Sequence, residues 1–312
     1  MNNPASVETI IAEARKESQR EPSAFTEFWS ELEKTLISLV YDSNLIESAG
    51  SSLRVTIKLC QDIFRGRQVS EVIDERDPEY GEHLRALIAT HRKGDLPNVL
   101  RSRKEVINHA KALNYMIDKV ILEHQPLSEE LILEAHRILC ENMNDDDVEP
   151  GQYRKHEVAV SYGKPGEKKK RSICMRASMV PKYMKEMANH LNDEIAQAEG
   201  AGELDPYTLA ARYKHQFIMI HPFADGNGRM SRIILNVLLL RYAGHVAVFG
   251  SEGDEKDQYL AIVRRGAKIF NEEDMEVDFH EQTSHNEFAR FLLTKSKASL
   301  EKMWNWASQE QG

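Results

Sequence analysis

The sequence has few cysteines and no long apolar run. Only Cys60, Cys140 and Cys174 are present among the 312 residues, and no two of them have the C-x-x-C spacing of a metal or redox site. Scattered cysteines in an odd number fit a reducing compartment better than a disulfide framework. No apolar stretch approaches the ~18 residues of a membrane-spanning helix, and the N-terminus lacks the pattern of a signal peptide. We therefore expect a cytoplasmic protein without a membrane partner, and nothing excludes the nucleus.

Excess basic charge is also missing. The chain has 50 acidic and 41 basic residues, which gives a formal charge of -9 at pH 7. A surface that coats nucleic acid is normally basic, so we expect no nucleic-acid partner. The apolar content of 41% and charged content of 29% are those of an ordinary globular protein. The length allows one large domain or two small ones, and no internal repeat or low-complexity segment is visible.

Helical periodicity dominates the sequence that is present. Residues 24–48 contain neither Pro nor Gly, and their apolar residues recur at spacings of three and four. Ser128 and Asp205 are suitable N-caps for later helices, and Gly244 is a suitable stop. The same periodicity predicts further helices over residues 55–64, 81–91, 106–120, 128–143, 181–200, 206–220, 227–243, 259–269 and 287–306.

One segment has a strong strand pattern. Residues 156–162 alternate apolar and polar side chains, residues 163–171 form a basic turn with Gly and Pro, and residues 173–175 could be a short return strand. The sequence therefore predicts an all-α, mainly helical fold with one short β-hairpin.

The segment from His221 to Arg232, HPFADGNGRMSR, lies between two predicted helices. Gly226 and Gly228 allow positive φ and a close approach of phosphate oxygens to backbone amides. Asn227 tolerates left-handed conformations and can donate from its side-chain amide. Successive N–H groups at a helix start form an anion-binding nest. The pattern predicts a phosphate site.

Charged side chains of the same segment would complete a transfer site. Arg229 and Arg232 project from the first helical turn, where two guanidiniums can grip phosphates bidentately. Asp225 is a hard oxygen ligand for Mg²⁺. His221, which normally titrates near neutrality, could remove a proton from an attacking hydroxyl. These are the parts that in-line transfer onto a hydroxyl requires.

Each of these features alone is common in structural roles. A histidine after an apolar run is usually structural, a pair of nearby glycines usually marks a turn, and two arginines usually form a solvated face. A DNA-binding helix-turn-helix is a further reading of the helix-loop-helix pattern, but the net acidity and the nest chemistry oppose it. A turn needs no acid, base and arginine pair at fixed offsets, so we favour the catalytic interpretation.

The segment resembles the signature of the Fic family, H-x-F-x-[DE]-G-N-G-R-x-x-R, at every fixed position. Residues 151–154, GQYR, are similar to the family's G-x-[YF]-R ahead of a flap hairpin, and residues 127–131 resemble the preceding helix start. The kinase-like Doc relatives depart from this signature. The resemblance implies three regions: N-terminal helices over 1–100, a catalytic core over 101–245 with its flap at about 156–175, and C-terminal helices over 246–312 that pack on the core.

The resemblance also implies roles for the residues of the motif. His221 would be the general base, Phe223 a core anchor for the loop, and Asp225 the ligand of Mg²⁺ (or Mn²⁺). The phosphates of ATP would be held by Gly226, Asn227, Gly228, Arg229 and Arg232.

Two further parts of the chain acquire roles in the same way. The hairpin would dock a target protein by strand addition, although it could instead be a surface arm that covers the core. Tyr259 begins a segment that resembles the one beside the family's adenine pocket, although a core or surface tyrosine fits equally well.

Ser43 and Glu47 form a candidate brake. They are four residues apart on a predicted helix at about 24–49, so they share one face. On their own they would be ordinary solvated residues. Their spacing resembles the inhibitory helix of one Fic class, [ST]-x-x-x-E-[GN], with Ser48 in place of Gly or Asn. The resemblance implies that Glu47 pairs with Arg232, and an arginine paired with a carboxylate cannot also clamp a phosphate.

We therefore expect an autoinhibited protein adenylyltransferase that moves AMP from Mg-ATP to a Ser, Thr or Tyr hydroxyl of a target protein and of itself. Some autoinhibited relatives also remove AMP. The alternatives are the same fold with another donor, giving UMP, phosphocholine or phosphate transfer, and a nucleotide-binding interaction module. His221 and Asp225 oppose the module, because binding alone needs no base. Family members often dimerise, so a homodimer is also an expectation.

Overall fold

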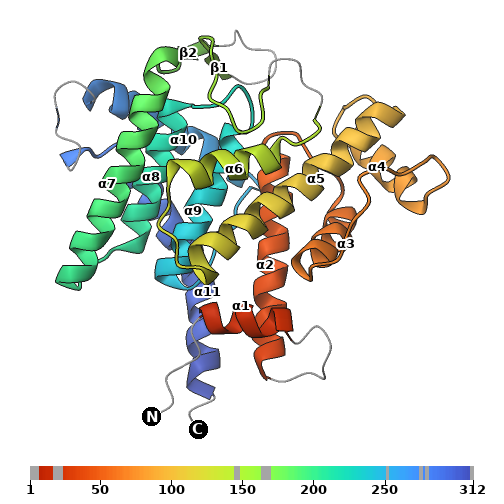
Figure 1. The fold of residues 1–312 in the computed structure, drawn as a ribbon, viewed down its shortest axis with the longest axis horizontal. Helices are drawn as coiled ribbons and strands as arrows, with labels where there is room; N and C mark the ends of the chain where they lie inside the picture. The colour runs from red at the N-terminus through yellow and green to blue at the C-terminus, as the bar shows by residue number, and fades with distance from the viewer. Residues whose placement is uncertain are drawn as a thin grey trace.

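The computed structural model describes residues 7–16, 24–143, 148–162, 170–250, 253–273, 277 and 281–309. Helices dominate it, and one two-stranded antiparallel sheet accompanies them (Figure 1). The predicted all-α fold with one hairpin is therefore confirmed. The elements are α1 (Val7–Lys16), α2 (Ala24–Ile46), α3 (Leu53–Phe64), α4 (Pro78–Ala89), α5 (Leu96–Ile117), η1 (Asp118–Leu122), α6 (Glu129–Leu139), β1 (Ala159–Tyr162), β2 (Lys170–Ile173), η2 (Ala177–Met179), α7 (Val180–Ala201), α8 (Pro206–Ile220), α9 (Asn227–Ala243), α10 (Glu255–Glu273) and α11 (Asn286–Gln309).

Local capping chemistry explains several of the helix ends. The Ser128 side chain accepts a hydrogen bond from the Leu131 N–H, and the Asp205 carboxylate accepts from two N–H groups in the first turn of α8. Gly244, at φ 73°, ends α9. These three signals confirm the sequence prediction. Helix α1 was not predicted, because a ten-residue helix gains most of its stability from packing, here against α2 and η1.

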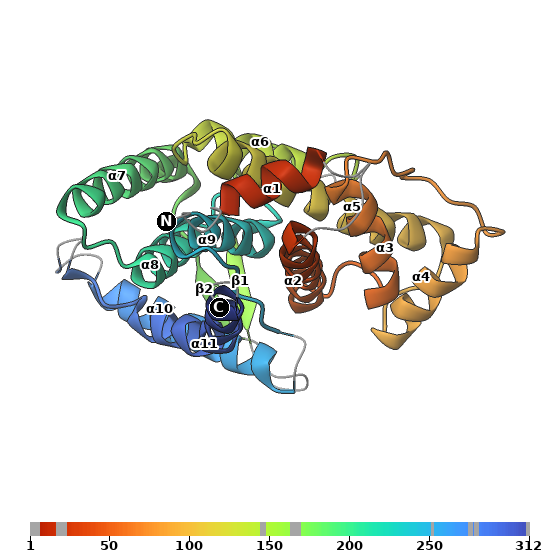
Figure 2. The same cartoon turned by 90° about the horizontal axis from the view of Figure 1, so that it is seen from below.

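Helix α9 lies at the centre of the molecule (Figure 2). Its residues from Arg229 to Leu240 are all buried, and it packs against α8, α5, α2 and α6. A helix that is buried on all sides is stable only when other elements surround it. The loop that precedes α9 is consequently fixed by several elements at once.

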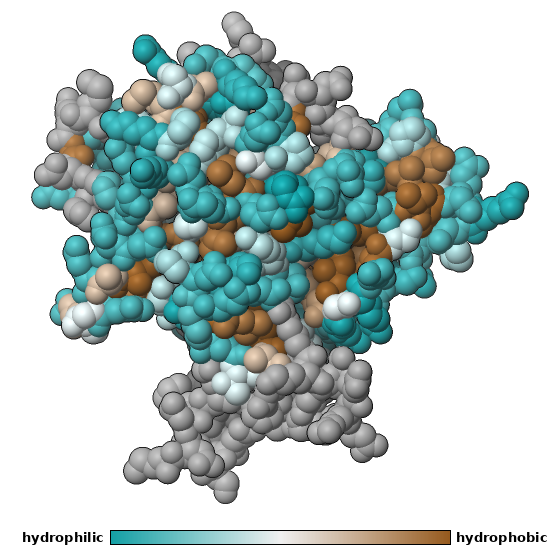
Figure 3. All heavy atoms as spheres, viewed as in Figure 1, coloured by the Kyte–Doolittle hydropathy of each residue, from teal (hydrophilic) through white to brown (hydrophobic). Residues whose placement is uncertain are grey.

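The remaining helices form two groups around this centre. Helix α2 runs beside α3 and α5 and also contacts α9, whereas α10 and α11 pack against α8 (Figure 2). The face shown in Figure 3 is mostly hydrophilic, with smaller apolar areas between the helices. Large exposed apolar side chains lie on several different elements: Leu53, Ile57, Val72, Ile88, Val160 and Leu293.

The hairpin stands at the top of Figure 1, and its strands differ from the prediction. β1 and β2 pair with Ala159 opposite Ile173 and Tyr162 opposite Lys170. The return strand therefore covers residues 170–173, not 173–175, and the first strand does not begin at 156. A two-stranded arm has exposed faces, so its return strand can carry the polar residues that had indicated a turn. The tip at 163–169 lies outside the described residues.

Candidate active site

The loop between α8 and α9 has left-handed backbone at both ends. His221 ends α8 at φ 52°, and Gly226 precedes α9 at φ 80°. The side chain of Asn227, the first residue of α9, accepts from the Phe223 N–H at 3.0 Å and donates to the Phe223 carbonyl at 2.8 Å. The Asn227 amide thus closes the loop, and its side chain is held there by both its oxygen and its nitrogen.

Phe223 anchors this loop in the core. Its side chain is fully buried and stacks on the His136 ring of α6, with centroids 3.6 Å apart and planes 1° from parallel. The Tyr153 and Phe217 rings lie around it at 5.7 and 6.1 Å. This packing agrees with the anchoring role predicted for Phe223.

Arg154 connects the loop to the hairpin. Its buried guanidinium donates to the His221 carbonyl at 2.7 Å, to the His156 carbonyl at 3.0 Å and to the Met175 carbonyl. Its backbone N–H donates to the Pro222 carbonyl at 3.0 Å. One side chain therefore holds His221, the main chain before β1 and the main chain after β2. The sequence marked Arg154 only as part of a motif and did not indicate this function.

The environment of His221 changes the expected titration. Burial, and secondly the positive charge of Arg154, lower the pKa of His221 to about 4, against the attraction of the Glu47 and Asp225 carboxylates. The expectation that His221 titrates near neutrality is therefore wrong. The ring is neutral at pH 7, which is the form that a general base needs.

Arg229 has unused hydrogen-bond donors at the start of α9. One of its nitrogens, Nη2, donates to Asp225 Oδ2 at 3.0 Å. Nε and Nη1 are buried and have no hydrogen-bond partner among the described residues. Buried donors without partners are costly, so the site favours an anionic ligand. The Asp225 side chain is 53% exposed and can reach a ligand beside it.

Arg232 lies in the site as predicted. Its guanidinium is 2% exposed and donates to Glu47 Oε1 at 2.6 Å, to Ser43 Oγ at 2.8 Å and to the Ser43 carbonyl at 3.0 Å. Burial alone would lower the pKa of Arg232, but the Glu47 carboxylate outweighs it and raises this pKa. The predicted pair of Glu47 and Arg232 is present, and Arg232 also binds Ser43, which was not predicted.

The Glu47 carboxylate also lies at the N-terminus of α9. A Cβ placed on Gly228 would overlap this carboxylate, so a glycine at 228 is what allows it to approach. The N-terminus of a helix carries partial positive charge and attracts anions. A carboxylate therefore stands where a phosphate group would be bound.

The candidate brake begins on α2 but ends beyond it. The helix stops at Ile46, not at 49, so Glu47 lies in the following turn. Ser48 has φ 55°, a left-handed conformation that Gly and Asn adopt at lower cost. This conformation explains why the family's pattern has Gly or Asn at the position of Ser48.

Helix α5 and the segment before it hold this turn in place. Glu105 accepts from the Gly50 N–H at 2.6 Å, and Arg92 and Ser102 donate to the Gly50 carbonyl at 2.9 and 2.7 Å. Arg92 also pairs with Glu105 at 2.8 Å. A polar cleft of about 800 Å³ opens beside these groups and is lined by Glu47, Ser48, Ala49, Arg92, Lys93, Asn98, Arg101, Glu105, Val148, Ala224, Asp225 and Arg229.

Tyr259 is buried behind Arg232. Its ring is 3% exposed, packs on Phe249 at 4.9 Å, and has Lys214 Nζ at 4.7 Å from its centroid. Burial raises the pKa of Tyr259, but the charges of Lys214 and Arg232 outweigh it and lower this pKa. Lys214 was not indicated by the sequence, because it lies on the apolar face of α8. A place for Tyr259 in an adenine pocket stays a prediction.

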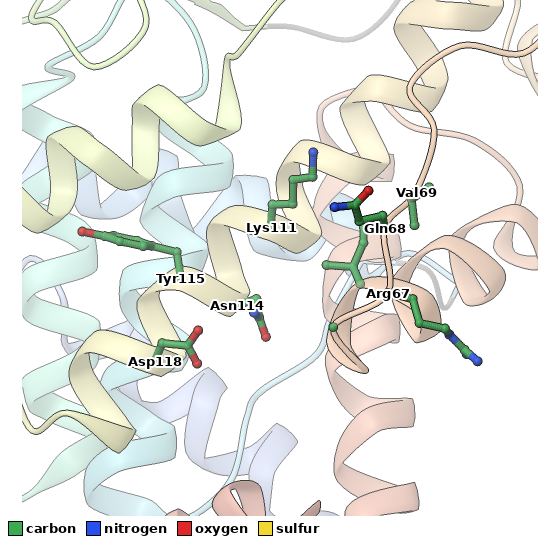
Figure 4. Close-up of a pocket in the computed structure, with 9 residues that line it drawn as sticks. Arg67, Gln68, Val69, Lys111, Asn114, Tyr115 and Asp118 are labelled. Atoms are coloured by element: carbon green, nitrogen blue, oxygen red, sulfur yellow. The ribbon is translucent and has the colours of Figure 1, made fainter. Parts of the chain in front are cut away.

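A second hollow, of about 480 Å³, lies between the segment after α3 and helix α5 (Figure 4). Arg67, Gln68 and Val69 line one side, and Lys111, Asn114, Tyr115 and Asp118 line the other. None of the predicted site residues contributes to it.

Two negative findings concern the described residues only. No group of three or more His, Cys, Asp or Glu side chains is placed there to hold a metal ion. A divalent ion at Asp225 would therefore need further oxygen ligands, such as phosphates. Within the same residues, every helix is too short or too polar to cross a membrane.

Fold and site together define a helical protein in which two buried arginines and a histidine meet at the start of the central helix. The model of the Fic/DOC family matches residues 126–239. Over this segment the chain is therefore similar to the Fic/DOC family. The match lies within the core predicted over 101–245, whose outer boundaries stay a prediction.

Curated relatives match part of the chain, and solved structures have a similar fold. The protein adenylyltransferases fic-1 of Caenorhabditis briggsae and Caenorhabditis elegans are each 32% identical over 143 residues, which cover 46% of this chain and 25% of theirs. A Fic domain containing signaling protein from Bacteroides thetaiotaomicron has a TM-score of 0.61 at 19% identity, covering 93% of this chain and 92% of that one. Fic-1 from C. elegans also has a TM-score of 0.61 at 20% identity, covering 97% and 72%. These structures support the fold, and the chain spans about a quarter of the length of the two curated relatives.

Proposed function

We propose that this chain is a protein adenylyltransferase that transfers AMP from ATP to a Ser, Thr or Tyr hydroxyl of a target protein and of itself, and that Glu47 holds it inactive. One observation carries the proposal. The Glu47 carboxylate binds Arg232 at the start of α9, where the outer phosphate of a nucleotide would lie. The curated relatives that cover part of the chain bear the name protein adenylyltransferase.

The residues present fit Mg-ATP. The N–H groups at the start of α9, the unpartnered nitrogens of Arg229 and the guanidinium of Arg232 would hold the phosphates once Glu47 withdraws. Asp225 would hold Mg²⁺ or Mn²⁺, which would neutralise charge on the phosphates. Two arginines beyond the nest favour a donor with more than one phosphate.

The reaction would use His221 as the base. Its neutral ring would accept the proton of the target hydroxyl while the hydroxyl oxygen bonds to the α-phosphorus of ATP. The bond from that phosphorus to the bridging oxygen would break, and pyrophosphate would leave. The helix start and the two arginines would stabilise the negative charge on the phosphates. Arg154 would keep His221 in place through its carbonyl.

The target protein would bind along the hairpin. β1 and β2 pair only with each other among the described residues, so their outer edges can accept an extended segment. Arg154 contacts carbonyls before β1 and after β2. A segment bound there would therefore be held close to His221.

The donor can be tested with two labels. Glu47→Gly protein would be incubated with Mg²⁺ and a lysate, using ATP labelled on either the α- or the γ-phosphate, and Glu47→Gly/His221→Ala would be the control. We expect label that requires His221, and is therefore missing in the control, from α-labelled ATP only.

Label from the γ-phosphate that is missing in the control would instead establish phosphate transfer by this protein, because kinases of the lysate label both samples. If the protein binds ATP but transfers no label from ATP, UTP or a phosphocholine donor, the result would favour a nucleotide-binding module. Excess EDTA should abolish labelling, because without a metal ion nothing would offset the repulsion between the Asp225 carboxylate and the phosphates.

A further inference from the structure

His136 of α6 touches the catalytic loop from the core side. The side chain is fully buried. Its Nδ1 lies 3.0 Å from the Gly151 nitrogen, and its Nε2 lies 3.1 Å from the Asp225 carbonyl oxygen. A backbone N–H can only donate and a carbonyl can only accept, so these partners assign a neutral ring with its proton on Nε2.

The loop is packed tightly on this ring. Phe223 stacks on His136 at 3.6 Å between centroids. A Cβ on Gly226 would lie 3.3 to 3.4 Å from atoms of Leu139, Cys140 and His136. Residues on both sides of Asp225 are therefore fixed against α6, and the Nε2–H of His136 fixes the main chain of Asp225 itself.

The same ring connects Asp225 to the segment that carries Arg154. Gly151 donates to His136, and three residues later Arg154 holds the His221 carbonyl at 2.7 Å and the Pro222 carbonyl at 3.0 Å. The end of the loop with His221 is thus held by the segment 151–154, and the end with Asp225 is held by His136.

We propose that His136 is a positioning residue for the metal–nucleotide site, acting through its hydrogen bond to the Asp225 carbonyl. This inference rests on the proposed function, because it assigns Asp225 to a divalent cation bound with a nucleotide. Groups that orient a metal ligand commonly change metal affinity about 10- to 100-fold when they are replaced. Replacing His136 would therefore lower the affinity for the cation, whereas the phosphate nest would stay intact.

Two substitutions separate the two hydrogen bonds of the ring. The terminal atoms of Asn lie at the position of Nδ1, and those of Gln lie near Nε2. His136→Gln can still donate to Asp225 but loses the acceptor for Gly151. His136→Asn can still accept from Gly151 but loses the donor to Asp225. His136→Phe keeps the stack on Phe223 and loses both bonds.

The variants would be made in Glu47→Gly protein, so that the nest is open. ATP affinity would be measured by titration calorimetry in Mg²⁺ and in excess EDTA, together with the thermal unfolding temperature. Mg²⁺ should increase the ATP affinity of the parent protein, and we expect this increase to be about 10-fold or more smaller in His136→Asn and His136→Phe. His136→Gln should retain most of it, and the affinity in EDTA should be unchanged in all three. His285→Gln, which replaces a buried histidine at the start of α11, serves as the control and should retain the whole gain.

Equal behaviour of the Asn and Gln variants in Mg²⁺ would overturn the proposal. So would an equal loss of affinity in Mg²⁺ and EDTA, because that would indicate a structural role only. If Glu47→Gly protein binds ATP without any dependence on Mg²⁺, the proposal also fails. Binding of Mg-ATP without AMP transfer would defeat the proposed function alone, and the comparison of variants would still decide the role of His136.

Discussion

At His221, burial and the charge of Arg154 lower the pKa to about 4, so the imidazole is already neutral at pH 7. A base with this pKa stays in its active form from about pH 5.5 to 8. Glu47 raises this pKa, so replacing Glu47 with Gly should lower it further.

We therefore expect the rate of AMP transfer by Glu47→Gly protein to show no titration of the base between about pH 5.5 and 8. The measurement is the initial rate of labelling across that range at saturating Mg-ATP. A rate that falls towards acid with an apparent pKa near 6.5, the value of an unperturbed histidine, would contradict this account.

The residues of the motif could be assigned expected roles one by one from the sequence. The residues that hold the motif in place could not. His221, Asp225, Arg229 and Arg232 stand within twelve positions of sequence, so their types and spacing indicate one site. His136 lies 89 positions before Asp225, and its partners are backbone atoms. Backbone atoms are the same at every residue, so no sequence pattern can mark such a contact.

The commitment of the Asn227 side chain to Phe223 was missed for the same reason. The residue type allowed donation to a phosphate and also closure of the loop. Only the position of the Phe223 backbone shows that the side chain closes the loop.

Among the elements, the turn after α2 would decide, under the proposed function, whether the site is open. Glu47 reaches Arg232 from this turn, and Glu105 on α5 holds the turn through the Gly50 N–H at 2.6 Å. The Glu105 side chain is 6% exposed and also pairs with Arg92 and Arg101. Glu105 has no contact with Arg232 among those described, so it would act on the brake alone.

We expect Glu105→Ala to weaken the brake. A lost hydrogen bond to a charged group costs about 1.5–3 kcal/mol, which corresponds to a shift of about 10-fold or more between closed and open turns. The initial rate of AMP transfer by Glu105→Ala should therefore rise by about 10-fold. It should remain below the rate of Glu47→Gly.

Two control variants test whether the effect passes through Glu47. Glu105→Gln keeps an acceptor for the Gly50 N–H and should rise less than Glu105→Ala. Adding Glu105→Ala to Glu47→Gly should give no further increase, because the brake is already absent. An increase of the same size in both backgrounds would show that Glu105 acts elsewhere.

The helices were predictable as elements, whereas their ends and the hairpin were less so. Periodicity and caps such as Ser128 predicted the long helices. The end of α2 at Ile46 was missed, because the left-handed Ser48 that follows it is a residue type that rarely adopts this conformation. The hairpin register depends on pairing between strands, and residues 170–173 have no apolar alternation to reveal it.

For the whole molecule, buried histidines set the response to acid. Burial is the main cause that lowers the pKa of each, to about 3 for His215 and to about 4 for His83, His136, His221 and His285. An unfolded histidine takes up a proton near pH 6.5, so the unfolded chain binds more protons than the folded one below that pH. The stability that these groups contribute is complete above about pH 6.5 and is lost as the pH falls towards 4.

We therefore expect the free energy of unfolding to fall steeply between about pH 6.5 and 4.5, by up to about 1.4 kcal/mol per pH unit for each such histidine. Urea titrations at several pH values would measure it. His285→Gln should make the slope shallower, since it removes one protonation. A free energy of unfolding that is constant from about pH 7 to 5 would contradict the burial of these rings.

The arrangement of the whole chain brings brake and site together from distant sequence. Ser43 and Arg232 are 189 positions apart, yet they meet because α2 and α9 pack against each other. The resemblance to an inhibitory helix predicted this meeting, while composition and periodicity alone did not. The central claim is that a complete transfer site is blocked by one carboxylate.

The most direct test compares AMP transfer by wild-type protein, Glu47→Gly and Glu47→Gly/His221→Ala, with α-labelled ATP and Mg²⁺. We predict little label with the wild type, a rise of at least about 10-fold with Glu47→Gly, and a return to background when His221 is also removed. Equal labelling by the wild type and Glu47→Gly, with both proteins folded and binding ATP, would contradict the account.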